Sequence, residues 1–360
     1  MKTRANDAAP VPFTLPRSKY AFVNDMVRVI PKVERPVDIR EAMDFFRSED
    51  PRTKVPLVDG TTIDYLPAQR LALPVNKDNA IAAGIVKEED RDLMVDTVYL
   101  NLRRGVLDKS ELMVIDLLSN FDWKRPIHFT QVYILQNLGL TDYLQFDGYS
   151  YRLVPILTPY DRRVGEIGRI DPDVIYPLLM ETFRYGNVSD PRVYVDNFIQ
   201  YNLMASGARE AFARAAKAFL RRGGAGDRDK AVALLDAGLE KMPPAQIRYT
   251  FSNTFPFLEA YYAAGEMEKG DALLLSYAEN LMQYLDYYLA FEGVQGDMVS
   301  GLIDDKLDEL GQIYLLAGYA GRRDAVARLN DYYRTLGATD EDLLHVDAPG
   351  EATDSLLPIP

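Results

Sequence analysis

The hydrophobic pattern of the chain changes near residue 170. Before that point, several short runs alternate between apolar and polar residues, as half-buried strands do. These runs lie at 26–30, 96–102, 126–134 and 149–157. Helical spacing appears at 38–50, 108–121 and 141–146. After Asp171 a helical pattern continues to about Leu336. The pattern therefore predicts an α+β protein, in which a small mixed α/β domain is followed by an all-α part.

Local signals mark where the first elements begin and end. Asp38 is a good N-cap for the helix at 38–50, and Glu41 stands three residues later, the spacing of a capping box. Pro51 follows the apolar run and is expected to end the helix. Asp59 and Gly60 form a turn signal that predicts a β-hairpin.

The helical part carries a recognisable repeat pattern. Residues 310–318 read LGQIYLLAG, which matches the first helix of a tetratricopeptide hairpin. Tyr261 and Gly265 stand in the same relation, and residues 231–243 match a second helix. The interval between Gly265 and Gly318 departs from the regular repeat. We therefore predict an all-α, tetratricopeptide-like array of about three irregular helical hairpins, which stack on one another and are capped by the α/β domain.

These changes predict the organisation of the chain. The segments are a linker (1–19), the mixed α/β domain (20–170), the helical, tetratricopeptide-like domain (171–345) and a flexible tail (346–360). No stretch reaches the ~18–20 apolar residues of a membrane helix. The N-terminus also lacks the apolar core of a signal peptide. We expect no direct membrane insertion by this chain.

Composition excludes several classes of function. The net charge is −13, and most of the excess acid lies after residue 200. Such a surface repels phosphate backbones, so no nucleic-acid partner is expected. The chain has no cysteine, which rules out disulfides, thiol catalysis and thiolate metal sites. Gly165 and Gly168 form only G-x-x-G, far short of a dinucleotide fingerprint, and no cofactor is predicted.

Candidate catalytic residues are few. The two histidines, His128 and His345, lie in a strand-like run and in the tail, and no pattern joins either to a nucleophile. Acidic clusters at 88–92 and 304–309 are more typical of solvated surface than of a catalytic pair. The ligand spacing of an EF-hand is absent. The sequence therefore predicts no catalytic residue and no metal site.

A few cations next to aromatic residues are better candidates, in this case for binding or docking. They are Arg52, Lys54, Trp123, Arg125, Tyr151 and Arg152. A tryptophan beside arginine can stack on a sugar face or hold an anionic group. The alternative is that Trp123 fills the core while the cations pair with nearby acids. The many tyrosines of the helical part likewise have two interpretations: they pack between helices, or they recognise a ligand.

Four segments together carry a family resemblance. They are DFFRSEDPRTK (44–54), DWKRPIHF (122–129), YLQFDGYSYRLVPI (143–156) and YGNVSDP (185–191). In this order they resemble the C-terminal region of a bacterial family of large membrane proteins, whose multi-spanning part is similar to protein O-mannosyltransferases. In that family, catalysis is expected on a loop of the membrane part, so no catalytic residue is carried over to this chain.

The resemblance implies a function for the chain as part of a larger protein. It would be a non-catalytic module on the periplasmic side of the inner membrane, and its parent would be a glycosyltransferase. Its partners would be the missing N-terminal membrane region, on which it docks, and acceptor proteins that it presents. The alternative is a stand-alone helical-repeat protein that binds proteins or glycans, with no enzyme attached.

Overall fold

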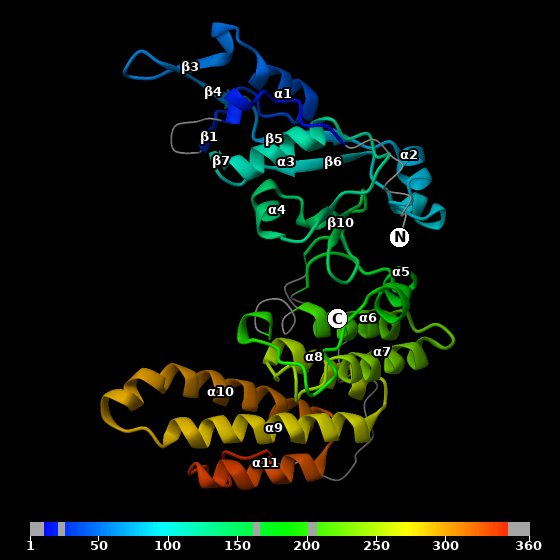
Figure 1. Ribbon diagram of the computed structural model, residues 1–360, viewed down its shortest axis with the longest axis vertical. Helices are drawn as coiled ribbons and strands as arrows, with labels where there is room; N and C mark the ends of the chain where they lie inside the picture. The colour runs from blue at the N-terminus through cyan, green and yellow to red at the C-terminus, as the bar shows by residue number, and fades with distance from the viewer. Residues whose placement is uncertain (1–10, 21–25, 161–165, 201–206, 345–360) are drawn as a thin grey trace. The chain divides into compact units, whose positions relative to one another are not determined.

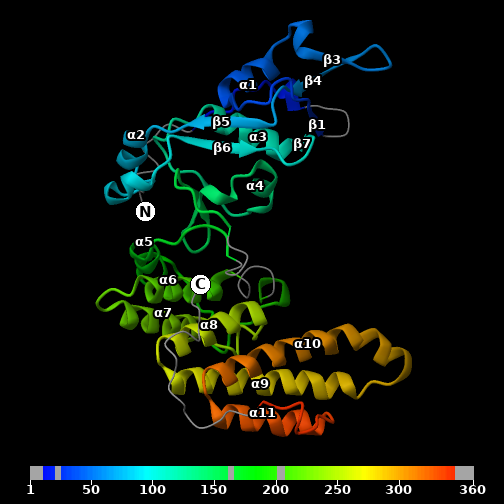
Figure 2. The ribbon, with the colours of Figure 1, turned by 180° about the vertical axis from the view of Figure 1, so that it is seen from behind.

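The structure is a computed structural model that describes residues 11–20, 26–160, 166–200 and 207–344. The chain divides into two compact units, Met1–Arg169 and Ile170–Pro360. Figures 1 and 2 show the elements of both units from opposite sides. The first unit mixes strands with helices, and the second is helical. The predicted fold class, a mixed α/β part followed by helical hairpins, is confirmed.

Three small sheets form the framework of the described part of the first unit. The strands are β1 (Met26–Val29), β2 (Val37–Asp38), β3 (Lys54–Pro56), β4 (Thr62–Leu66), β5 (Arg70–Pro74), β6 (Thr97–Asn101), β7 (Val106–Asp108), β8 (His128–Phe129), β9 (Leu144–Phe146) and β10 (Tyr151–Leu153). The strand orders are β3-β4-β1-β7, β2-β5-β6 and β8-β10-β9. β1 is parallel to β4 and antiparallel to β7, and β2 is parallel to β5, so the first two sheets are mixed.

Two amphipathic helices supply much of the core of this unit. Its α-helices are α1 (Ile39–Arg47), α2 (Lys77–Ala82), α3 (Lys109–Ser119) and α4 (Tyr133–Leu138). Short 3₁₀-helices lie at Arg17–Tyr20, Pro51–Thr53, Glu88–Leu93 and Thr141–Tyr143. α1 packs against α3, and both bury their apolar faces in one core. Asp38 caps α1, as predicted, by accepting from the Arg40 amide at 2.8 Å. The reciprocal capping box is instead on α3, between Asp108 and Glu111.

Local predictions hold in part. The Asp59-Gly60 hairpin is confirmed, since β3 and β4 pair antiparallel on either side of it. The strand predicted at 126–134 was wrong beyond Phe129, because α4 begins at Tyr133 and buries Leu135 and Leu138 at helical spacing. The helix predicted at 141–146 is one 3₁₀ turn followed by β9.

Part of the predicted linker, residues 11–19, is packed against the first unit. The buried carboxylate of Asp116 accepts from the Thr14 amide at 3.0 Å, the Thr14 hydroxyl at 2.8 Å and the Leu15 amide at 3.1 Å. The Tyr20 hydroxyl donates to it at 2.8 Å. Burial and this carboxylate raise the pKa of Tyr20. A buried carboxylate with four donors holds this segment in place.

The second unit is an array of helical hairpins. Its elements are α5 (Pro172–Pro177), a π-helix (Leu178–Thr182), α6 (Arg209–Arg222), α7 (Asp227–Lys241), α8 (Phe251–Ala263), α9 (Met267–Leu289), α10 (Gly293–Tyr319) and α11 (Arg323–Thr335). Contacts join α6 to α7, α8 to α9 and α10 to α11, and further contacts of α6 with α8 and of α9 with α10 join successive hairpins. Each hairpin thereby covers the apolar face of its neighbour.

The predicted second helix at 231–243 shows why a small residue is needed in this packing. Gly238 of α7 faces Phe212 of α6 and Phe257 of α8. A β-carbon there would come within 2.9 Å of the Phe257 ring and 3.0 Å of the Phe212 β-carbon. Both phenylalanines are fully buried. The glycine therefore allows three helices to meet at one point.

Tyrosines fasten neighbouring helices by hydrogen bonds to acceptors on the next helix. Tyr261 of α8 donates to Asp236 of α7 at 2.9 Å, and Tyr277 of α9 donates to Glu309 of α10. Burial raises the pKa of both phenols, and the neighbouring carboxylates raise it further. For these buried rings, the packing interpretation holds.

Candidate functional site

The sheet β8-β10-β9 brings together two of the segments that carry the family resemblance. β8 lies in DWKRPIHF, and β9 and β10 lie in YLQFDGYSYRLVPI. β10 is the central strand, paired antiparallel with both neighbours. Segments with separate places in the sequence thus form one surface, which makes this sheet the candidate functional site.

The register gives the sheet one polar face and one aromatic face. Arg152 pairs with His128 on one side and Gln145 on the other, so these three side chains share a face. On the opposite face, Tyr151 lies between Phe129 and Phe146, and its ring centroid is 5.0 Å from that of Phe146. The polar row across the three strands is the chemically interesting face.

A buried ion pair occupies the middle of this polar face. The Arg152 guanidinium lies 3.0 Å from the Asp147 carboxylate, and both side chains are buried. Arg152 also donates to the Gly84 carbonyl at 2.8 Å, and Gln145 donates to Asp147 at 3.1 Å. A buried pair whose members also make hydrogen bonds to neighbouring groups fixes local geometry, and removing one partner leaves an uncompensated charge. The guanidinium is therefore committed to the fold rather than offered to a ligand.

His128 is at the open end of the polar face. Its Nδ1 lies 3.0 Å from the Ser150 hydroxyl, the one hydrogen bond of the ring within the described residues. Partial desolvation of the ring lowers the pKa of His128, the charge of Asp147 opposes this shift, and the charge of Arg152 adds to it. The imidazole is therefore neutral near pH 7. A serine–histidine pair without a carboxylate bonded to the imidazole lacks the orienting group of a hydrolytic triad.

Acidification is expected to destabilise the protein through His128. Because its folded pKa lies below the ordinary 6.5, the unfolded chain takes up the proton first as the pH falls. The contribution of the neutral imidazole to the free energy of unfolding is fully present above pH 6.5. It is lost as the pH falls from 6.5 through the lower pKa of the folded state. Denaturant unfolding at about pH 7.5 and about pH 5.5 should show a smaller loss of stability for His128→Gln than for the wild type.

The chain has two histidines, and His345→Gln is the control variant that measures how much the second histidine contributes to the pH dependence of stability. If the free energy of unfolding depended on pH equally in the wild type and in His128→Gln, the neighbourhood of Asp147, Arg152 and Ser150 would not shift the pKa of the imidazole.

The outer edge of the sheet is closed by the segment around Arg169. Its amide donates to the Leu144 carbonyl at 2.9 Å, and its side chain is 2.9 Å from Asp90. Gly168 has φ +81°, and a β-carbon there would lie 3.0 Å from the Leu144 carbonyl oxygen. The glycine singled out in the sequence as a weak nucleotide-binding signal is thus required for this close approach.

The predicted binding loop at 50–54 is distant in the sequence and holds two different cations. Arg52 is exposed, with 89% of its side-chain surface open, and makes a bidentate contact with Asp50. Hydrogen bonds from the Arg52 side chain and amide lower the pKa of Asp50 to about 2. Lys54 is largely buried, donates to Ser48 and pairs with Asp64. Of the two, Arg52 is the one that a partner can reach.

Trp123 fills the core. The hypothesis that it stacks on a ligand is therefore wrong, and the alternative, that it is a core residue, is confirmed. The residue is fully buried, its indole N–H donates to the Pro74 carbonyl at 2.8 Å, and its ring lies 4.7 Å from that of Phe121. Burial of this large apolar ring outweighs exposure beside two cations. Arg125, two residues later, is half-buried on the way to β8.

The structure therefore unites some of the predicted residues and separates others. Tyr151 and Arg152 lie on one strand but on opposite faces, and neither forms a common surface with Arg52 in the contacts described. Sequence reasoning missed Gln145 and Asp147, which surround Arg152. The signal for Asp147 was present in the Asp-Gly pair that follows Phe146, a turn between two strands.

Neither a metal centre nor a membrane helix is found in the described segments. No group of three or more His, Asp or Glu side chains there could hold a metal ion. No helix in the same segments is long and apolar enough to cross a membrane.

Comparison with known proteins identifies the first unit. Residues 1–174 match the family model described as TMEM260-associated domain 2. This part of the chain is a TMEM260-associated domain. The match covers the whole first unit, Met1–Arg169, and includes the candidate sheet. No curated protein and no solved structure gave a significant match to the chain.

Proposed function

We propose that this chain is a non-catalytic module of a membrane glycosyltransferase that resembles protein O-mannosyltransferases. The observation that carries the proposal is the match of residues 1–174 to a TMEM260-associated domain, because TMEM260 is a membrane O-mannosyltransferase-like protein. The module would lie on the periplasmic side of the inner membrane. It would dock on the membrane region and present acceptor proteins through its helical hairpins.

The roles of the shared motif residues support a module that assists catalysis elsewhere. Trp123 and Arg152 are buried and held by protein partners, so they build the domain. Arg52 is exposed on a loop of another shared motif, which makes it the docking candidate of choice. An exposed arginine on an ordered loop suits a polar contact with a partner protein.

A transfer assay with lipid-linked mannose tests this function. The purified chain alone is expected to transfer no mannose to an acceptor protein. Deleting residues 1–360 from the parent membrane protein should reduce the rate of mannose transfer in membrane vesicles by at least about tenfold, because the acceptor protein is no longer positioned. Mannose transfer by the isolated chain would overturn the proposal.

Charge reversal at the docking candidate gives a finer test of the same proposal. Arg52→Glu in the membrane protein should weaken transfer, whereas the matched change Arg103→Glu, at another exposed arginine of the first unit, should not. Equal effects of the two variants would remove Arg52 from the docking surface.

A second candidate function is a stand-alone helical-repeat protein that binds proteins or glycans. It is favoured by a groove of about 570 Å³ lined by α7, α8 and α9, which includes Tyr249, Leu239 and Pro244. The polar side chains at this groove already bond to one another, as Lys269 does to Asp236 and Tyr249 to Ser276. Unchanged mannose transfer after the deletion would favour this candidate over the first.

A further inference from the structure

The tip of the α9–α10 hairpin exposes apolar side chains that the described residues leave uncovered. We define the hairpin tip as residues 282–305, the end of α9, the turn and the start of α10. The exposed fractions are 62% for Tyr287, 76% for Val294, 79% for Met298 and 44% for Leu302. Figure 1 shows this end of the hairpin reaching past the end of α11.

Three of these residues form a continuous stripe. Val294, Met298 and Leu302 are spaced four residues apart on α10, so they follow one another along a single face of the helix. Gly301 lies beside them with open space around it, since an added β-carbon would meet no atom within 4 Å. The stripe is therefore an accessible apolar ridge rather than a closed packing surface.

The aromatic residues at the turn give this ridge a rigid base. The rings of Tyr287 and Phe291 lie edge to face with centroids 5.2 Å apart, and Tyr287 lies 5.7 Å from Tyr288. Rings held by one another lose little freedom when a partner covers them, which favours binding.

The charge of the hairpin tip has one sign. The segment contains five acidic residues, Asp286, Glu292, Asp297, Asp304 and Asp305, and neither lysine nor arginine. Four of them, all except Asp286, make no ion pair or side-chain hydrogen bond with a described residue, whereas Asp286 accepts from Tyr332. The next residue after the tip, Lys306, pairs with Glu309, which shows the usual compensation.

The apolar stripe and the acidic charge together limit which kind of partner can bind the hairpin tip. A second copy of the chain would bring the same acidic tip, and like charges oppose that contact. Anionic lipid is repelled for the same reason. A cationic segment with apolar side chains on one face satisfies both features, since its apolar face covers the stripe while its cations meet the unpaired carboxylates.

We propose that the hairpin tip docks a cationic amphipathic segment of a partner protein, anchored on Val294, Met298 and Leu302. The surface is in the second unit, outside the TMEM260-associated domain, and the inference does not depend on the proposed glycosyltransferase role.

Binding of a model peptide to the full chain tests the proposal. The probe is a short helical peptide of leucine and lysine with its leucines on one face, and its counterpart has glutamate in place of lysine. The lysine peptide is expected to bind, with affinity that falls as salt rises, and the glutamate peptide is not. Combining Val294→Ser, Met298→Ser and Leu302→Ser should weaken binding at least about tenfold.

Matched variants distinguish binding at the hairpin tip from attraction of the peptide to acidic residues elsewhere on the protein. Combining Asp297→Asn, Asp304→Asn and Asp305→Asn should weaken binding about tenfold, whereas Glu88→Gln, Glu89→Gln and Asp92→Asn, which remove equal charge from the first unit, should leave it unchanged. Val58→Ser with Leu157→Ser serves as the control for exposed apolar side chains elsewhere. Far-UV circular dichroism establishes that every variant is folded.

Equal binding of both peptides, or equal effects of the tip variants and the control variants, would overturn the proposal. Stronger binding of the chain to neutral or anionic lipid vesicles than to the lysine peptide, lost in the same tip variants, would also overturn it, in favour of a membrane surface.

Discussion

Replacing Trp123 with alanine is expected to lower the free energy of unfolding by about 3–5 kcal/mol. The indole is fully buried beside Phe121, so its removal leaves a cavity in the core that joins the helices and sheets of the first unit. The Pro74 carbonyl loses its donor in the same variant. Denaturant unfolding followed by far-UV circular dichroism measures the loss, because the variant has no tryptophan left for fluorescence.

Two further substitutions at this position separate volume from polarity and backbone. Trp123→Phe keeps a ring but removes the N–H donor, and is expected to lose about 1–2 kcal/mol. Trp123 is also the one non-glycine residue with positive φ, +65°, among the described residues. Trp123→Gly is therefore expected to be more stable than Trp123→Ala by about 1 kcal/mol, the reverse of the usual order.

Tyr133→Ala is the matched control, since this ring of the same unit is mostly exposed. It should change the free energy of unfolding by less than about 0.5 kcal/mol. If Tyr133→Ala lowered the free energy of unfolding as much as Trp123→Ala does, Trp123 would not have the core position that its burial indicates.

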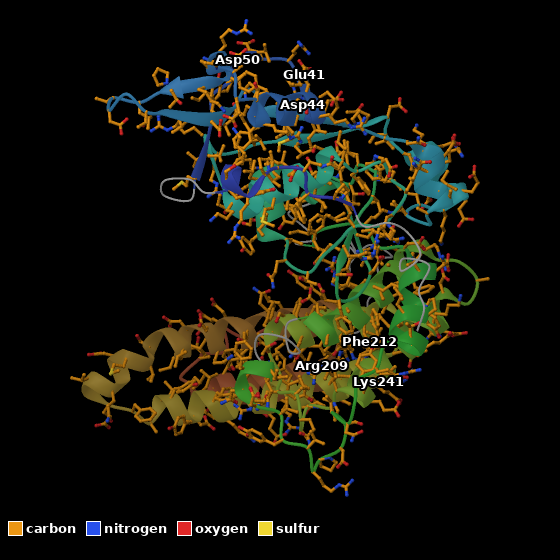
Figure 3. The ribbon with its side chains drawn as sticks, turned by 45° about the horizontal axis from the view of Figure 1, so that its top comes forward. Glu41, Asp44, Asp50, Arg209, Phe212 and Lys241 are labelled. Carbon is orange, nitrogen blue, oxygen red and sulfur yellow. The ribbon has the colours of Figure 1, made fainter. Side chains whose placement is uncertain are left out.

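Replacing Arg209 with alanine is expected to destabilise the helical unit by about 2–4 kcal/mol. Arg209 starts α6 and is fully buried (Figure 3). It donates to the carbonyls of Met242 at 2.5 Å and Ile247 at 2.6 Å, and to the side-chain oxygen of Asn253 at 3.2 Å. The guanidinium thus ties the end of α7, the connection after it and the start of α8 to α6.

The magnitude of this effect is the difference between two opposing contributions. Burial without a carboxylate partner in the described contacts lowers the pKa of Arg209 to about 10, so the folded state carries the cost of a desolvated cation. Truncation removes that cost but leaves buried carbonyls without donors, and the second effect is larger when several acceptors are involved. Arg209→Lys should lose less than Arg209→Ala, because an ammonium can still reach some of these acceptors.

Hydrogen exchange read peptide by peptide locates the effect. Protection is expected to fall in α6, α7 and α8 for Arg209→Ala, while Arg328→Ala, at an exposed arginine of α11, should leave it unchanged. Loss of protection confined to the first unit, with α6 to α8 unaffected, would contradict the role assigned to Arg209.

Some elements of the fold were predictable because their signals are local. Asp38 and Asp108 cap α1 and α3 through their own side chains, which requires nothing from distant residues. The hairpin at Asp59 and Gly60 likewise depends on the turn that joins its strands. Gly238 lies in the stretch 231–243 that matches the second helix of a hairpin, but its aromatic neighbours Phe212 and Phe257 come from two other helices.

The candidate site was less predictable, because it depends on pairing between segments. The side chains that meet on its polar face, Arg152, Gln145 and His128, come from three strands, and their register determines which of them share a face. A one-residue change of register would have placed Tyr151 there instead. Likewise, the exposure of Arg52 and the burial of Trp123 follow from packing, and the composition near both residues is similar.

The sequence by itself determined the order of a mixed α/β part and a helical part, the N-cap of α1 at Asp38, and a family resemblance that the match of residues 1–174 supports in part. Periodicity and caps act within a few residues, so they can be read along the chain. The tertiary structure alone decided that Arg152 is neutralised by Asp147, that Trp123 is core, and that no described residue covers the apolar stripe of α10. These outcomes depend on which distant side chains come within contact distance, because burial and charge pairing are properties of neighbours in space.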